Sequence, residues 1–113
     1  MGKKRKRIIL VDADVVSHFI VGGEIYLLPR IFPYKMKILD KVYTELERFR
    51  ARKIEVDNLL NQKLIELMPF PEDRQEIKRE YFRIKRDLFM GDGESACLSV
   101  IRFTNDIIGS SNL

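Results

Sequence analysis

Four side chains with oxygen donors stand where they could act together on a metal ion and a phosphate group. Asp12 directly follows an apolar run, and Glu45 lies one turn into an expected helix. Glu94 opens a later expected helix, and Asn112 follows the last apolar run. Carboxylate and amide oxygens without histidine or cysteine partners suit Mg²⁺ or Mn²⁺ and are poor ligands for zinc. Because grouped carboxylates repel one another unless a cation lies among them, these residues predict a magnesium or manganese site.

Each acid taken alone also fits a structural role. Asp12 or Asp14 can cap the helix that follows them, and Glu45 can be an ordinary solvent-facing residue. Glu94 is favourably placed in a first helical turn, where negative charge complements the helix dipole. His18 is expected to be a surface or packing residue rather than a ligand. The order of the acids along the chain therefore carries more weight than any one of them.

The elements that must position these residues are predicted from hydrophobic periodicity. Continuous or β-branched apolar runs predict four short strands at 8–11, 36–39, 64–68 and 107–110. Helical spacing and breaker residues predict helices at 15–21, 24–28, 40–52, around 56–60, 72–89 and 94–103, the second broken by Pro29. Strands that alternate with helices indicate one α/β domain over residues 8–113, with a mostly parallel sheet of about four strands between two helical layers.

In open parallel sheets, ligands bind outside the carboxyl ends of the strands. Asp12 stands at that edge after the first strand, and Asn112 comes just past the fourth. Glu45 and Glu94 belong to helices that begin or pack near the same edge. We therefore expect all four side chains to converge on one crevice.

Composition limits the classes of protein to consider. The 113 residues, 45% of them hydrophobic, fit one domain with one core. The longest apolar run, Ile8 to Val11, is far shorter than the ~20 residues that cross a bilayer, so no membrane partner and no secretory leader are expected. Cys97 is the single cysteine, which excludes an internal disulfide and suits a core residue in a cytoplasmic protein.

The basic character of the chain is local. Lys3, Lys4, Arg5, Lys6 and Arg7 carry five positive charges, one more than the net charge of +4, so the remainder carries −1. Residues 1–7 are therefore expected to form a flexible basic arm. Such an arm can contact nucleic-acid phosphates, or it can simply be a solubilising terminus.

Four motifs in order resemble the PIN domain family, which includes the VapC-type toxins and related metal-dependent ribonucleases. The matching segments are Ile9–Val16, Val42–Glu47, Gly91–Cys97 and Ile107–Asn112. They cover nearly the whole chain after the basic arm. Each motif alone is weak, whereas four in the right order with suitable spacing are fairly specific.

The resemblance implies an endoribonuclease that uses Mg²⁺ or Mn²⁺ to hydrolyse RNA phosphodiester bonds. The acids of the family fall on Asp12, Glu45 and Glu94, which would hold the metal, with Asn112 as a weak further ligand. Asp14 and Ser110 would orient the ligands or the substrate. Many bacterial members are toxins paired with a small antitoxin protein, and homodimers are common, so both partners are expectations here.

Two departures from the family pattern affect these expectations. Asn112 supplies a neutral oxygen where the family has a fourth acid, so metal binding should be weaker and a second ion is not expected. The sequence also ends a few residues past the fourth strand, so the C-terminal strand and helix of the family are expected to be missing.

Two other functions fit parts of the sequence. A non-catalytic PIN-like module that binds nucleic acid or protein would explain Asn112 and the short C-terminal end. A haloacid-dehalogenase-like phosphatase would use Asp12 as nucleophile and Asp14 as acid and base, and Gly91-Asp92-Gly93 resembles a later element of that family. The second alternative fits less well, because that element should follow an apolar strand and here follows a charged helix.

Overall fold

The computed structural model describes residues 7–88 and 90–109; Lys3 to Lys6 of the basic arm, Ser110 and Asn112 lie outside these ranges. In chain order the elements are β1 (Ile8–Val11), α1 (Ala13–Val21), the 3-10 helix η1 (Ile25–Leu27), α2 (Leu28–Ile31), β2 (Lys35–Leu39), α3 (Asp40–Glu47), α4 (Arg50–Asn61), β3 (Glu66–Met68), α5 (Gln75–Leu88), α6 (Asp92–Arg102) and β4 (Ile107–Gly109).

The four strands form one sheet in the order β3-β2-β1-β4, and every neighbouring pair is parallel. Ile9 of β1 pairs with Met36 of β2 on one side and with Ile107 of β4 on the other. All four residues of β1 are buried, as expected for a central strand covered on both faces. The prediction of an α/β fold around a parallel sheet of four strands is confirmed.

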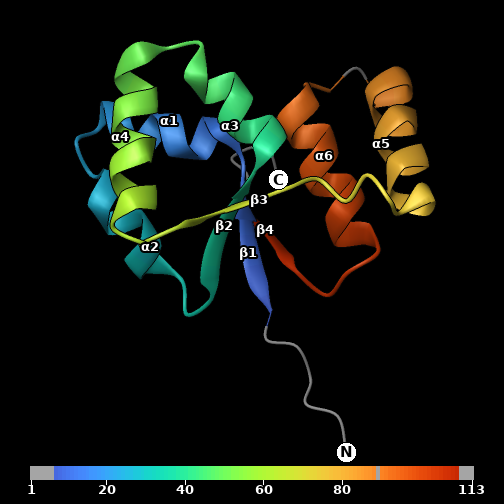
Figure 1. Cartoon of the computed structure of the whole chain (residues 1–113), viewed down its shortest axis with the longest axis horizontal. Helices are drawn as coiled ribbons and strands as arrows, with labels where there is room; N and C mark the ends of the chain where they lie inside the picture. Colours follow the sequence, from blue (N-terminus) through green and yellow to red (C-terminus); the bar gives the residue numbers. More distant parts are fainter. Residues whose placement is uncertain (1–6, 89, 110–113) are drawn as a thin grey trace, which may run out of the picture.

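Helices cover both faces of this sheet (Figure 1). α1, α2 and α4 lie on one side, α5 and α6 lie on the other, and α3 lies over the carboxyl ends of the strands. The arrangement is compatible with the expected three-layer architecture. In the described part of the chain no helix is both long and apolar enough to span a membrane.

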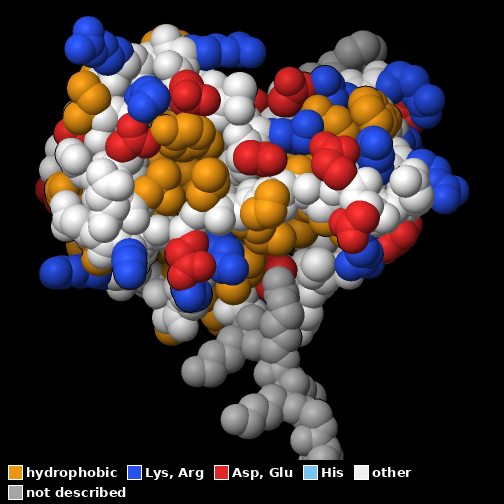
Figure 2. All heavy atoms as spheres, viewed as in Figure 1, with side chains coloured by type: hydrophobic (Ala, Val, Ile, Leu, Met, Phe, Trp, Pro, Cys, Tyr) orange, Lys and Arg blue, Asp and Glu red, His pale blue; other side chains and the backbone are white. Residues whose placement is uncertain are grey.

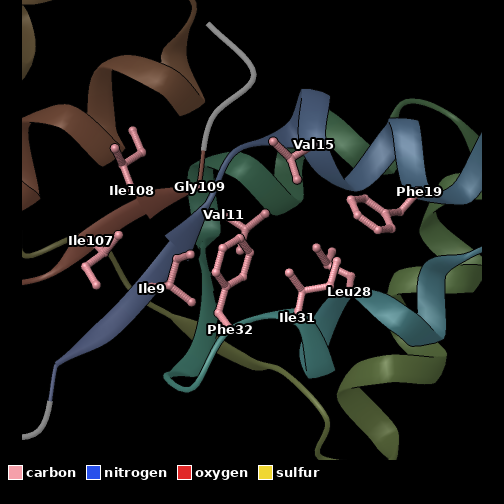
Figure 3. Close-up of a pocket in the computed structure, with 10 residues that line it drawn as sticks. All are labelled: Ile9, Val11, Val15, Phe19, Leu28, Ile31, Phe32, Ile107, Ile108 and Gly109. Carbon is pink, nitrogen blue, oxygen red and sulfur yellow. The ribbon is translucent and has the colours of Figure 1, made fainter. Parts of the chain in front are cut away.

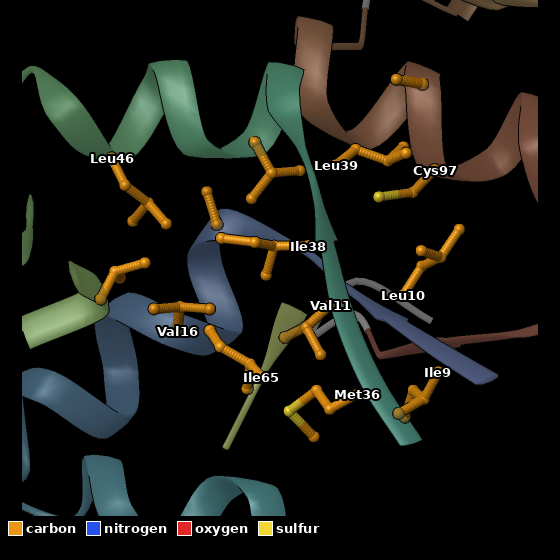
Figure 4. Close-up of a cluster of buried hydrophobic side chains, with 14 of the residues drawn as sticks. Ile9, Leu10, Val11, Val16, Met36, Ile38, Leu39, Leu46, Ile65 and Cys97 are labelled. Atoms are coloured by element: carbon orange, nitrogen blue, oxygen red, sulfur yellow. The ribbon is translucent and has the colours of Figure 1, made fainter. Parts of the chain in front are cut away.

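The core consists of the strand side chains and the inner faces of the helices (Figure 4). Val16 of α1 and Leu46 of α3 lie on one side of the sheet, and Cys97 of α6 lies on the other. Leu10 and Ile38 are fully buried between them. The expectation that Cys97 is a core residue is confirmed.

The boundary between two predicted helices is wrong. Helices were expected at 40–52 and around 56–60, whereas α3 ends at Glu47 and α4 runs from Arg50 to Asn61. The apolar spacing continues in phase through Val56, so the sequence does not mark a break at Arg48 and Phe49. A straight helix over 40–61 would extend about 33 Å, roughly twice the length of a five-residue strand. The chain therefore turns at Phe49 so that Val56 packs against the core.

Smaller corrections concern capping and proline. Asp40 is the first residue of α3, and its Oδ1 accepts from the amides of Lys41 (2.8 Å) and Phe70 (3.2 Å). Pro29 was expected to break the chain but lies in the first turn of α2, where an amide proton is not required. Asp12, not Asp14, caps α1, which begins two residues earlier than expected.

Charged side chains of both signs are interspersed on the surface over α5 and α6 (Figure 2). Arg83 pairs with Glu80 on α5, and the neighbours Arg86 and Asp87 pair with each other. Exposed pairs of this kind contribute little to stability. The charged face of α5 is therefore the solvated surface that its sequence indicates.

An apolar pocket of about 340 Å³ lies on the α1 side of the sheet (Figure 3). Ile9 and Val11 of β1, Phe19 of α1 and Ile107 of β4 form much of its lining. Its lining contains no ionisable side chain. Acid–base or metal chemistry therefore requires a different place on the molecule.

Candidate metal centre

Asp12 is buried at the carboxyl end of the central strand. Its backbone amide donates to the carbonyl of Gly109 (2.9 Å), which ties the end of β1 to β4. Its Oδ1 accepts from the amide of Ala13 (2.7 Å) and caps α1. The residue is only 3% exposed, and its Oδ2 accepts no hydrogen bond from the described residues. A buried carboxylate oxygen without a partner is costly, so this atom is suited to a cation.

Glu45 reaches the start of α6 from α3. Its Oε1 accepts from the amide of Gly93 at 2.6 Å, a contact between residues 48 positions apart. A Cβ on Gly93 would lie 3.0 Å from the same Oε1, so the glycine permits this close approach. The next residue of α6 is Glu94. The hydrogen bond therefore brings two of the predicted acids to the junction between α3 and α6.

The pKa of Asp12 reflects its surroundings. Burial raises the pKa of this carboxyl from 3.8 to about 6, the Ala13 amide opposes the shift, and the charges of Asp14, Glu94 and Glu45 add to it. Burial also raises the pKa of the Cys97 thiol, and the charges of Asp12, Glu45 and Glu94 act in the same direction. The charges of Asp14, Glu45 and Glu94 therefore act on the carboxyl group at the end of β1.

The arrangement provides oxygen donors of the kind that magnesium and manganese prefer. Asp12 contributes a buried oxygen that has no hydrogen-bond partner within residues 7–88 and 90–109, and the charges of Glu45 and Glu94 act on the same carboxyl group. In residues 7–88 and 90–109, no three His, Cys, Asp or Glu side chains form a group that could hold a metal ion. The donor types and the buried Oδ2 of Asp12 fit a divalent cation, whereas the acids of the described ranges do not together form a metal-binding group in this structure.

The other predicted residues have different positions. Asp14 is exposed in the first turn of α1, where its charge acts on Asp12. Arg7 is exposed, and its Nε donates to the carbonyl of Asn105. His18 is exposed on α1. The expected roles of Ser110, Asn112 and residues 3–6 fall on residues that the structure does not describe.

The role of the Gly93 amide was not predicted from the sequence. In the Gly-Asp-Gly-Glu segment, only Glu94 was predicted to have a role at the site. The structure shows that the amide of Gly93, the second glycine, positions Glu45. The signal was present in the residue type, because glycine at the start of a helix has low helix propensity and permits close packing. Its partner, however, could not be identified without the tertiary structure.

The chain matches no protein-family model, and neither curated proteins nor solved structures gave a match. The candidate site is therefore argued from its own residues.

Proposed function

We propose that this chain is a PIN-like, metal-dependent endoribonuclease that hydrolyses phosphodiester bonds in single-stranded RNA. The proposal rests on the buried Oδ2 of Asp12, which lacks a hydrogen-bond partner among the described residues. The charges of Glu45 and Glu94 act on the same carboxyl group and raise its pKa. It lies at the carboxyl edge of a parallel sheet, where such folds bind ligands. The four ordered sequence motifs support the same proposal.

Each acid has a distinct part in the proposed mechanism. Asp12 keeps its Oδ1 on the Ala13 amide, which fixes the carboxylate and leaves Oδ2 for the ion. The Gly93 amide orients Glu45, and Glu94 projects from the first turn of α6. When bound, Mg²⁺ or Mn²⁺ supplies a Lewis acid for a phosphoryl oxygen and lowers the pKa of a coordinated water. Burial of the Asp12 carboxylate strengthens its interaction with that ion.

Cleavage of single-stranded RNA tests the proposal. Cleavage should require Mg²⁺ or Mn²⁺, stop with EDTA, and be lost in Asp12→Asn and Glu94→Gln, which remove charge with little change in shape. Glu47→Gln is the matched control, because Glu47 is an exposed acid on the same helix as Glu45. Cleavage that survives both substitutions in equally pure preparations would show that these acids hold no catalytic ion.

A non-catalytic RNA-binding module is the second candidate. The observation that favours it is that the described residues contain no ready-made group of metal ligands. This alternative predicts RNA binding that is the same with and without divalent ions, and no cleavage by the parent chain. A phosphatase that used Asp12 as nucleophile would instead hydrolyse a small phosphate monoester, so the same preparations should be assayed on such a substrate.

A further inference from the structure

A second pocket, lined by charged as well as apolar side chains, adjoins the acidic centre. It has a volume of about 210 Å³ and lies between the first turns of α1 and the junction of α3 with α4. Ser17 is half-buried on its α1 wall. The pocket exists because the chain turns at the α3–α4 junction instead of continuing as one helix. The side chains that could contact a ligand there are those of Asp14, Ser17, Glu45, Arg48, Phe49 and Arg52.

The pocket is continuous with the candidate metal centre. Glu45 lines the pocket and also accepts the hydrogen bond from Gly93. Asp14 lines it from α1, and its charge acts on Asp12. A nucleic-acid strand with one phosphate at Asp12, Glu45 and Glu94 would therefore have the neighbouring nucleotide at this pocket.

Two arginines provide positive charge in the pocket. Arg48 is exposed and Arg52 is half-buried, and neither forms an ion pair with any residue of the described ranges. By contrast, Arg83 and Arg86 on α5 are each bound to a carboxylate. A guanidinium group matches the geometry of a phosphate and binds it through two parallel hydrogen bonds. The pocket thus offers two such groups to an anion.

Phe49 adds an exposed aromatic surface beside these arginines. Its side chain is 52% exposed, and the guanidinium of Arg52 lies 4.2 Å from the centre of its ring. The residue precedes α4 in an extended conformation, so the turn directs it away from the core. An exposed ring next to cationic groups is typical of surfaces that bind single-stranded nucleic acid by stacking its bases.

We infer that this pocket binds the nucleotide adjacent to the cleaved phosphate of a single-stranded RNA. Arg48 and Arg52 contact the phosphate of that nucleotide, and the ring of Phe49 stacks on its base. This inference rests on the proposed function, because the acids define which phosphate is cleaved. Arg48 and Arg52 formally balance the charges of Asp14 and Glu45, which share the pocket with them, so binding of this nucleotide does not require a cation at the acids. Arg48 and Phe49 of the α3–α4 junction and Arg52 of the first turn of α4 then contact the substrate directly.

Binding of a labelled single-stranded RNA oligonucleotide in EDTA tests the inference without cleavage. Fluorescence anisotropy should be measured over a range of salt concentrations with the full chain. Arg48→Gln and Arg52→Gln should each weaken binding and reduce the salt slope by about 0.7, the change expected for one lost phosphate contact on a single strand. Arg52→Lys should keep the slope of the parent, because it keeps the charge.

Phe49→Ala should weaken binding at least about fivefold and leave the salt slope unchanged, since stacking involves no counterion release. Arg30→Gln on α2 is the matched control, an exposed arginine that contributes nothing to the pocket lining. Thermal unfolding of every variant separates a binding defect from a folding defect.

The possible results separate this inference from the nuclease proposal. Arginine variants with the slope and affinity of the parent, or an equal effect of Arg30→Gln, would overturn the phosphate contacts. Phe49→Ala with the parent's affinity would overturn the stacking contact. A parent chain that binds no RNA overturns the inference entirely. Binding that depends on the pocket in a chain that cleaves nothing, even with Mg²⁺, would support the pocket and refute only the nuclease activity.

Discussion

Replacing Asp12 with asparagine should remove a pH-dependent loss of stability from this fold. The asparagine side chain keeps an oxygen that can accept from the Ala13 amide, so the cap of α1 is retained. What the substitution removes is a buried charge on Oδ2, which has no hydrogen-bond partner in the described part of the chain. The perturbation therefore isolates the cost of that charge.

The pKa shift sets the magnitude. Burial raises the pKa of Asp12 from 3.8 to about 6 in the folded state. The folded chain therefore binds this proton more tightly than the unfolded chain does. The free energy of unfolding then decreases as pH rises through this interval, and the decrease is complete above the folded-state pKa. At ~1.4 kcal/mol per pKa unit the parent loses about 3 kcal/mol over the whole interval.

Urea unfolding between about pH 4 and about pH 7, in EDTA, measures this difference. The gain in stability of Asp12→Asn over the parent should grow by about 2–3 kcal/mol across that range. Asp73→Asn is the control, because Asp73 is an exposed acid in the loop before α5. Adding Mg²⁺ near neutral pH should stabilise the parent by linkage and leave Asp12→Asn unchanged.

If the free energies of unfolding of Asp12→Asn and the parent differed by the same amount at all pH values, the predicted effect of burial on Asp12 would be wrong. Such a result would mean that water or a rearranged partner satisfies Oδ2, and that burial does not disfavour the charged form. Equal stabilisation of both chains by Mg²⁺ would place the ion away from Asp12.

Three further predictions concern packing. Gly93→Ala should cost about 1–3 kcal/mol and abolish RNA cleavage, because the new Cβ would lie 3.0 Å from Oε1 of Glu45; urea unfolding and a cleavage assay measure both effects. Cys97 should react with iodoacetamide only in denaturant, since its thiol is buried and its pKa is raised; mass spectrometry of the labelled chain would contradict this by finding modification of the native protein. Leu46→Ala should lower the free energy of unfolding in urea by about 2–5 kcal/mol, because Leu46 is only 1% exposed. Val21→Ala should change it by no more than about 0.5 kcal/mol, because Val21 is 78% exposed.

The strands could be predicted because their signals are local. The run Ile8 to Val11 is apolar without interruption, and its residues are buried on both faces as such a run indicates. Asp12 follows it and has a side chain that suits a helix cap, which it forms. The order of the strands in the sheet was not predicted, since many parallel arrangements have the same alternation of strands and helices.

The α3–α4 junction could not be predicted from periodicity. The apolar residues before and after Phe49 remain in helical phase, and no glycine or proline marks the break. The break follows from the dimensions of the sheet, which a continuous helix would overrun. Phe49 lies at this break and is half exposed beside the pocket between α1 and the α3–α4 junction.

Most strands and helices, and the acids at their ends, follow from local sequence, because these elements depend on neighbours within a few turns. The contact between the Gly93 amide and Glu45 depends on the packing of the helices over the sheet, as does the burial of Oδ2 of Asp12 without a partner among the described residues. These features join positions far apart in the chain, so their energies depend on how the helices pack over the sheet. The chemistry of the acids is set by their residue types, and their burial and mutual repulsion are properties of the assembled fold.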